Sequence, residues 1–247
     1  MVSMDMYLEA LRVRLEQLYS KENTKIQEAA RLCYECIQRG GVIQVFGSGH
    51  SIGFGMELIG RVGSLIPIHM IDTSDFVLRG LVSYADYKDP THIFERREGI
   101  AERLFKLYTI HEEDLFIIIS NSGINGVVID MAITATQKGH TLIVITSLEH
   151  TLAEDSRHPS GKKLYELADL VIDNCGPMGD ALLAIDENTK ICSLSSITGA
   201  FIAQMITTEC VDRFLVNGLE PPILMNEDTL EAMTHNQAIL QRYDTRI

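Results

Sequence analysis

The 247-residue sequence has no long hydrophobic run and little positive charge. Its longest apolar stretches, such as residues 115–119, are the length of a β-strand, whereas a membrane-spanning helix needs about 20 apolar residues. Polar residues interrupt the N-terminal segment, which lacks the apolar core of a secretory signal. The formal net charge is −13, and the basic face typical of nucleic-acid-binding proteins is missing. These absences predict a cytoplasmic protein that binds neither membranes nor nucleic acid.

Cysteine is also scarce, with five residues at irregular spacing. An odd count without a framework indicates reduced thiols rather than a disulfide-bonded secreted domain. Cys33 and Cys36 have C-x-x-C spacing, but they fall in a helical pattern and no second pair accompanies them. Packing in the core is therefore the better interpretation of this pair than zinc or redox chemistry.

After Gly41, the sequence alternates between short apolar runs and helical patterns. Several runs are apolar throughout, which is typical of parallel strands covered on both faces. The alternation predicts right-handed βαβ units in an open, doubly wound α/β sheet. The predicted strands are residues 42–46, 66–71, 115–119, 142–145 and 170–172.

Helical patterns flank these strands on both sides. Before them, apolar spacing predicts one helix around residues 7–18 and a second that begins after Thr24, where Gln27 would complete a capping box. After them, an apolar helix over 197–216 precedes a polar terminal helix. Without an internal repeat or long linker, the chain is expected to be one domain. Its parts are N-terminal helices (1–40), an α/β core (41–216) and a C-terminal tail (217–247).

Two of the predicted strands end in loops rich in serine and glycine. Glycine lets the backbone approach a ligand closely, and the N-terminus of a following helix attracts anions. Serine and asparagine are also ordinary helix caps, but two such loops in one sheet favour a site for a phosphate ester, because ligands collect beyond the carboxyl ends of parallel strands. The candidate binding residues are Ser48, Gly49, His50, Ser51, Ser120, Asn121, Ser122, Gly123 and Asn125.

The two loops are Gly47-Ser48-Gly49-His50-Ser51 and Ser120-Asn121-Ser122-Gly123-Ile124-Asn125. They resemble the paired signatures of the sugar isomerase (SIS) family, G-x-G-x-S and S-x-S-G-x-[TN]. The similarity covers roughly residues 40–215. The resemblance implies a five-stranded parallel, flavodoxin-like sheet and a homodimer or homotetramer. It also implies that a phosphosugar binds at the serine loops, with Ser51, Ser120, Ser122 and Asn125 as phosphate ligands.

Within this family, the sequence is similar to an uncharacterised bacterial group related to phosphoheptose isomerases. The similarity lies in residues 156–163, in residues 173–177 and in His235-Asn236. That group usually has a second histidine after the first-loop serine, where this sequence has Ile52. A mechanism that needs a His-x-His pair is therefore not expected here.

Aldose–ketose isomerisation needs a base that moves a proton between neighbouring carbons and an acid that opens the sugar ring. Glu57 resembles the glutamate of phosphoheptose isomerases if one helical turn is deleted, and would lie about 9 Å along a helix from Ser51. Alternatively, Glu57 pairs with Arg61 at i+4. His50 is a further candidate, as is His235, which would act in its own or a neighbouring subunit's site. Some phosphoheptose isomerases bind zinc through a histidine on this helix. Because this sequence has Glu57 at that position, no complete set of zinc ligands is visible and no metal is expected. An organic cofactor is not expected either.

A basic segment follows, with Arg157, His158, Lys162 and Lys163. It is either a solvated loop or a lid whose cations close over the phosphate, and we favour the lid. The leading hypothesis is an aldose–ketose sugar-phosphate isomerase. One alternative is an etherase-like lyase that eliminates a lactyl ether from an amino-sugar phosphate. Another is a non-catalytic phosphosugar sensor, which is less favoured because residues 1–40 contain no basic recognition helix.

Overall fold

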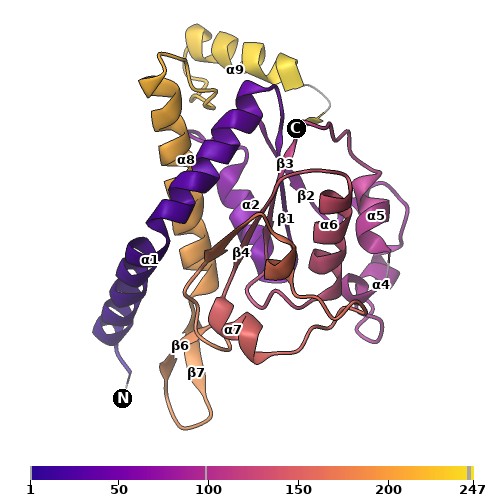
Figure 1. Ribbon diagram of the computed structural model, residues 1–247, viewed down its shortest axis with the longest axis vertical. Coiled ribbons are helices and arrows are strands. Elements are labelled where there is room, and N and C mark those ends of the chain that lie inside the picture. Colours follow the sequence, from indigo (N-terminus) through magenta and orange to yellow (C-terminus); the bar gives the residue numbers. More distant parts are fainter. Residues whose placement is uncertain (1, 98, 244–245) are drawn as a thin grey trace.

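A five-stranded parallel sheet with helices on both faces forms the centre of the molecule (Figure 1). The computed structural model describes residues 2–97, 99–243 and 246–247. The strand order is β2-β1-β3-β4-β5, so the predicted fold class is confirmed. The strands are β1 (Ile43–Gly47), β2 (Ile68–Ile71), β3 (Leu115–Ile119), β4 (Leu142–Thr146) and β5 (Leu170–Asp173).

Alternate residues of each strand point to opposite faces of the sheet, and both faces are covered. Ile117 and Ile119 of β3 join the core under α1 (Met4–Gln38), α2 (Ile52–Leu58) and α8 (Ser195–Val216). Phe116 and Ile118 join the core under α5 (Ile100–Phe105) and α6 (Gly126–Gln137). Burial on both faces explains why these strands are apolar throughout rather than alternating.

The N-terminal segment forms one continuous helix, α1, so the prediction of two helices is wrong. Thr24, expected to precede the start of a second helix, lies inside α1, and Ser3 is the N-cap of this single helix. No glycine or proline interrupts the polar stretch around Thr24, and helix propensity alone penalises such residues only weakly. Leu18 and Ile26, on either side of this stretch, are both buried, so a continuous helix keeps both contacts. Cys33 and Cys36 are also buried along α1, as predicted.

The C-terminal part adds a hairpin and a terminal helix to the sheet. The hairpin of β6 (Ala181–Ala184) and β7 (Lys190–Ser193) was not predicted from the sequence. The terminal helix α9 (Leu230–Tyr243) packs through Ile239 and Tyr243 on Val42 and Ile66, near the amino ends of the strands. The short elements are η1 (Gly49–Ser51), α3 (Asp75–Leu78), α4 (Tyr84–Tyr87), η2 (Phe94–Arg96), α7 (Leu148–Ala153) and η3 (Leu164–Leu167). Over the described residues, no helix combines the length and apolarity needed to cross a membrane.

Candidate functional site

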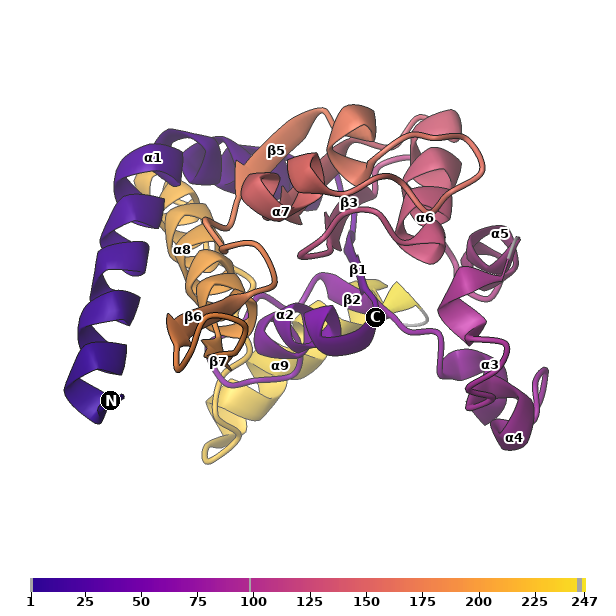
Figure 2. The same cartoon turned by 90° about the horizontal axis from the view of Figure 1, so that it is seen from below.

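The two serine loops lie side by side at the carboxyl end of the sheet, because β1 and β3 are neighbouring strands. Gly47 pairs with Ile119, so both loops begin at the same level. The view from below in Figure 2 shows this end of the strands, with the β6–β7 hairpin close to α2 and the start of α8. The loops border a cavity of about 340 Å³, the serine-loop cavity. Its lining residues are Ser48, Gly49, His50, Ser51, Ser120, Asn121, Ser122, Asn125, His150, Asp180, Ser193, Ser195 and Ser196.

All the candidate binding residues from the sequence line this cavity except Gly123, which shapes the loop. Gly123 has a φ of 63°, in the left-handed region that favours glycine. A Cβ atom at this position would meet the hydroxyl oxygens of Thr146 and Thr151, each at 2.8 Å. Glycine therefore lets the second serine loop fold close to the end of β4 and the start of α7.

Several polar groups face the cavity without a protein partner. Over the described residues, the hydroxyls of Ser48, Ser51 and Ser122 and the ring of His50 form no hydrogen bond. The first turn of α6 follows the second loop, and its N-cap residue Asn125 makes no side-chain capping bond. Backbone N–H groups at such a helix start are available to an anion. The cavity thus combines free hydroxyl donors with a helix N-terminus.

Asp180 brings a carboxylate into the cavity that the sequence analysis missed. Its Oδ1 accepts from the backbone N–H of Ser195 at 2.7 Å and of Leu194 at 3.2 Å, and its Oδ2 accepts from the Ser195 hydroxyl at 2.7 Å. These bonds join the start of the β6–β7 hairpin to the start of α8. Because this contact depends on the unpredicted hairpin, no local sequence signal marked Asp180.

His150 and Asn174 were also missed, although a signal existed. They follow β4 and β5, and the rule that identified the serine loops applies equally to the carboxyl ends of these strands. Asn174 donates to the Asn121 side-chain oxygen at 2.9 Å, and the Asn121 nitrogen lies 3.5 Å from His150 Nδ1. Asn121 is therefore held by residues from two further strands.

The model of the SIS domain family matches residues 6–147. The chain belongs to the SIS domain family. The sequence is 38% identical over 243 residues to a UPF0309 protein of Geobacillus sp. (strain WCH70), covering 98% of this chain and 96% of that relative. It is 34% identical over 248 residues to a UPF0309 protein of Caldanaerobacter subterraneus subsp. tengcongensis, covering 99% and 98%. The family predicted from the serine-loop signatures is thus confirmed.

Solved structures share the fold of this SIS domain. A phosphoheptose isomerase from Francisella tularensis has a TM-score of 0.54 at 15% identity, over 85% of this chain and 98% of that one. The Vibrio vulnificus NanR protein complexed with ManNAc-6P has a TM-score of 0.52 at 13% identity, over 96% and 68%. At these identities the likeness establishes the architecture.

Glu57 lies on α2 of the SIS domain, beyond the first serine loop, but does not line the serine-loop cavity. Its Oε1 accepts from the side-chain amide of Gln204 on α8 at 2.7 Å. Its other oxygen pairs with Arg61, so the alternative i, i+4 ion pair is formed. A catalytic role for Glu57 stays a prediction.

His235 lies on α9, at the opposite end of the sheet from the serine loops (Figure 1). Its Nε2 lies 3.0 Å from the carbonyl oxygen of Ile223, and its Nδ1 lies 3.0 Å from the Glu220 carboxylate. The side chain is only 13% exposed. A role for His235 in the cavity therefore requires the site of a neighbouring subunit, and this also stays a prediction.

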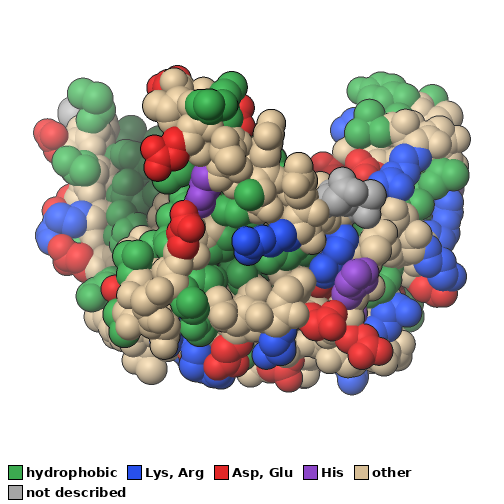
Figure 3. All heavy atoms as spheres, turned by 90° about the horizontal axis from the view of Figure 1, so that it is seen from above, with side chains coloured by type: hydrophobic (Ala, Val, Ile, Leu, Met, Phe, Trp, Pro, Cys, Tyr) green, Lys and Arg blue, Asp and Glu red, His purple; other side chains and the backbone are tan. Residues whose placement is uncertain are grey.

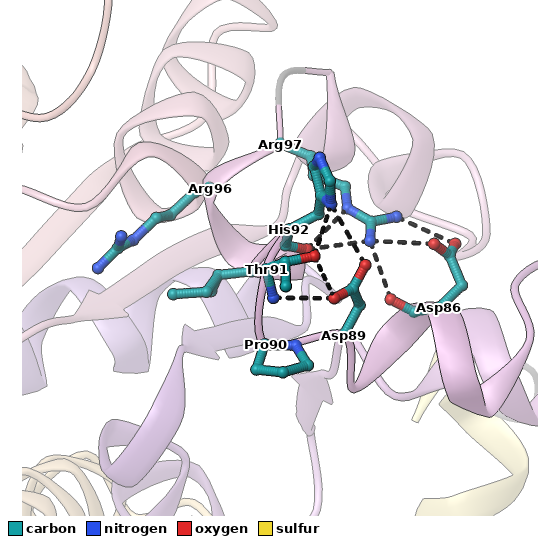
Figure 4. A pocket seen from close by; sticks show the side chains of 8 residues that line it. Asp86, Asp89, Pro90, Thr91, His92, Arg96 and Arg97 are labelled. Carbon is teal, nitrogen blue, oxygen red and sulfur yellow. Dashed lines mark hydrogen bonds and ion pairs between the residues drawn. The ribbon is translucent and has the colours of Figure 1, made fainter.

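A second hollow of about 570 Å³ lies over residues 86–97 of the SIS domain (Figure 4). Its polar groups bind one another: Arg97 Nη1 donates to Asp86 at 3.0 Å, and the Thr91 hydroxyl donates to Asp89 at 2.7 Å. The hydrogen bonds from Thr91 lower the pKa of Asp89 to about 2. Arg96 points away from this cluster (Figure 4). With most of its polar groups already paired, this hollow is a weaker candidate than the serine-loop cavity.

The described side chains do not form a metal site. Among the residues described by the structure, no group of three or more His, Cys, Asp or Glu side chains is arranged to hold a metal ion. The cavity lining is dominated by hydroxyl and amide groups, which suit a hydrogen-bonded anion or sugar better than a transition metal.

Proposed function

We propose that the serine-loop cavity binds a phosphorylated sugar and that the protein is an aldose–ketose sugar-phosphate isomerase. The observation that carries this proposal is the set of unpaired donors from two neighbouring loops, which face one cavity at the start of α6. Hydroxyls and backbone N–H groups suit the oxygens of a phosphate ester. The cavity volume of about 340 Å³ is in the range of small-molecule sites. Membership of the SIS domain family supports the same ligand class.

The isomerisation requires a base close to the sugar carbons, and we assign this role to Asp180, the carboxylate in the cavity lining. Its Oδ2 accepts one hydrogen bond, from Ser195, and a carboxylate oxygen can accept a second. Asp180 would take a proton from the carbon next to the carbonyl to give an enediolate. The proton of the neighbouring hydroxyl would pass to the former carbonyl oxygen, and Asp180 would return its proton to the former carbonyl carbon. His50, whose ring has no partner among the described residues, would act in opening the sugar ring.

We also propose that the protein forms a homo-oligomer. The N-terminal part of α1 extends away from the sheet (Figure 2), and Met4, Met6, Leu8 and Val13 on it are exposed. Burying such side chains in a contact between copies is favourable. Light scattering at micromolar concentration should give a mass above that of the monomer, and a monomeric mass would contradict this proposal.

The phosphate site is tested by replacing Ser120 and Ser122 with alanine. Loss of two donors to a charged acceptor should weaken phosphosugar binding by roughly 2–5 kcal/mol. Binding is measured by thermal shift with a panel of phosphosugars that includes ManNAc-6P, because a ligand raises apparent stability by mass action. Ser120 also accepts from the N–H of Gly123 at 3.1 Å, so Ser122→Ala alone separates donor loss from loop stability.

Thr91→Ala is the matched control, because it removes one hydroxyl from the second hollow. We expect it to leave phosphosugar affinity unchanged. Wild-type affinity in the Ser120→Ala/Ser122→Ala variant would mean that the phosphate does not bind at these serines.

The reaction is tested by product analysis of each phosphosugar that binds. The expected product is the ketose or aldose isomer, detected by NMR. Release of lactate from an ether-bearing amino-sugar phosphate would identify the lyase alternative. Binding without turnover of any tested phosphosugar would favour a sensor.

A further inference from the structure

The segment after α7, residues 154–163, is paired with the second serine loop. The backbone N–H of Arg157 donates to the carbonyl of Ile124 at 2.9 Å, and the N–H of Leu164 donates to the carbonyl of Gly123 at 2.9 Å. This pairing places Arg157 beside the N-cap residue of α6, and its Nη1 donates to the Asn125 side-chain oxygen at 3.0 Å. Asn125 is a lining residue of the serine-loop cavity. The guanidinium therefore lies at the rim of this cavity.

The positive charge of Arg157 is not compensated by the described protein. Among the described residues, no carboxylate lies within ion-pair distance of Arg157, and its side chain hydrogen-bonds to the neutral amide of Asn125. The cavity lining itself contains Asp180 and no lysine or arginine. A bound phosphate dianion beside Asp180 would need a cation nearby, since like charges repel strongly where water is excluded. Arg157 is placed to supply it.

His158 fixes the segment to α6. Its Nε2 lies 2.8 Å from the Asp130 carboxylate, and its Nδ1 lies 2.7 Å from the Ser160 hydroxyl. The His158 side chain is 12% exposed. Asp130 lies four residues after Gly126, about 6 Å along the axis from the start of α6. This contact holds Arg157 at the helix start and gives the nearby Asp130 carboxylate a hydrogen-bonding partner.

The two lysines of this segment differ from Arg157 in their contacts. The Lys163 ammonium donates to the Thr151 carbonyl oxygen at 2.8 Å, which holds it against α7. The Lys162 side chain has no partner among the described residues. Among the described residues, neither lysine side chain hydrogen-bonds to a residue that lines the serine-loop cavity, so the lysines of this segment differ from Arg157 in environment.

We propose that Arg157 is the cationic ligand of the phosphate group and that His158 is its positioning residue, acting through the contact with Asp130. This inference rests on the proposed binding of a phosphosugar at the serine loops. The recognised chemistry is a phosphate monoester dianion, which a guanidinium can bind through two parallel N–H groups.

Isothermal titration calorimetry of variants of the 247-residue chain with inorganic phosphate and with ManNAc-6P tests this inference. Arg157→Ala should weaken the affinity for both by about 10- to 100-fold, as for loss of a charge-assisted hydrogen bond. Arg157→Lys should restore part of the loss, because lysine keeps the charge without the planar fork. Lys162→Ala is the matched control, a cation of the same segment whose loss should leave the affinity unchanged. Unphosphorylated ManNAc should bind Arg157→Ala and wild type equally.

The positioning role is tested by a double-mutant cycle. His158→Ala should lower phosphate affinity less than Arg157→Ala does, and should have no further effect when Arg157 is already alanine. His158→Gln should restore part of the affinity, because its amide can donate to Asp130. Independent, additive losses in the double variant would overturn the positioning role.

The outcomes also separate this inference from the proposed function. If Ser122→Ala weakens phosphate binding and Arg157→Ala does not, the serine site stands and Arg157 is not its ligand. If the wild type binds neither phosphate nor any phosphosugar, both the site and the inference fail.

Discussion

The two ends of the parallel sheet differ in whether their polar side chains are hydrogen-bonded within the protein. At the carboxyl end, hydroxyls of the serine loops face a cavity and, among the described residues, Ser48, Ser51 and Ser122 find no partner. At the amino end, the buried Asp114 is surrounded by donors. It accepts from the N–H of Val42 at 2.9 Å and of His111 at 3.1 Å, from the Gln44 amide at 2.9 Å, and pairs with Arg246.

This difference distinguishes a stabilising network from a binding site. A buried carboxylate that has lost its water must be hydrogen-bonded, so the donors around Asp114 serve the fold. Unpaired donors at the carboxyl end contribute little to the stability of the fold and remain free for a ligand. At the amino end, the surface on the side of α9 shows acidic and basic side chains intermixed (Figure 3). The comparison predicts that substitutions at the carboxyl end change function and that those at the amino end change stability.

The largest expected effect is on turnover at the carboxyl end. Asp180→Asn keeps the size of the side chain and removes its basicity, so kcat should fall by about 10²- to 10⁴-fold, the usual contribution of a general base. Phosphosugar affinity should not fall, because the serine donors remain and the loss of the Asp180 charge relieves its repulsion of the phosphate. The rate is measured with a substrate identified by product analysis.

Two variants control this prediction. Ser195→Ala removes the hydroxyl that Asp180 binds but leaves the carboxylate, and should retain most of the turnover. Glu57→Gln should also retain turnover, because Glu57 is bound by Gln204 and Arg61 outside the cavity. If Glu57→Gln abolishes turnover and Asp180→Asn does not, the base is Glu57, as the family resemblance implied.

At the amino end, Asp114→Ala should destabilise the protein by about 3–5 kcal/mol, because it leaves the partner charge and several buried donors unpaired. The free energy of unfolding is measured by urea titration. Asp114→Asn, which keeps one acceptor oxygen, should lose less. The folded Asp114→Ala protein should bind the phosphosugar with wild-type affinity. A loss of affinity without a loss of stability would break the distinction between the two ends.

The sequence predicted the parts of the fold that depend on local patterns. The strand runs were apolar because both faces of the sheet are buried, and the serine loops were marked by residue types needed at a strand end. The same local logic was wrong at Thr24, where a capping signal competed with burial of Leu18 and Ile26 on one helix. Tertiary packing decided between them, and packing is not visible in a local pattern.

The candidate site was predictable only where its residues are adjacent in sequence. The Asp180 carboxylate reaches the start of α8 through a hairpin whose strands carried no strong signal. Likewise, the contact of Arg157 with Asn125 joins two segments that are separated by 32 residues. Such contacts depend on how whole elements pack. Composition and spacing therefore identified the basic segment, but they could not predict which of its side chains lies at the cavity.

The smallest expected effect concerns the pH dependence of the amino end. His69 on β2 is hydrogen-bonded to Gln44, with 2.8 Å between Nδ1 and Oε1, and Gln44 in turn donates to Asp114. Burial lowers the pKa of His69, and it outweighs the opposing charges of Asp75 and Asp114. The folded protein therefore binds this proton less readily than the unfolded chain does, whose histidine titrates near its usual pKa of about 6.5.

It follows that stability should decrease as the pH falls below about 6.5, since protons then favour the unfolded state. Urea titrations at pH 7.5 and pH 5.5 should show a smaller difference for His69→Gln than for the wild type. Phosphosugar affinity at pH 7.5 should be equal in both proteins, because His69 belongs to the network of Asp114 and not to the cavity lining. If the free energy of unfolding changes between the two pH values as much in His69→Gln as in the wild type, His69 is not the group whose titration lowers the stability. An altered phosphosugar affinity would show that the two ends of the sheet are coupled.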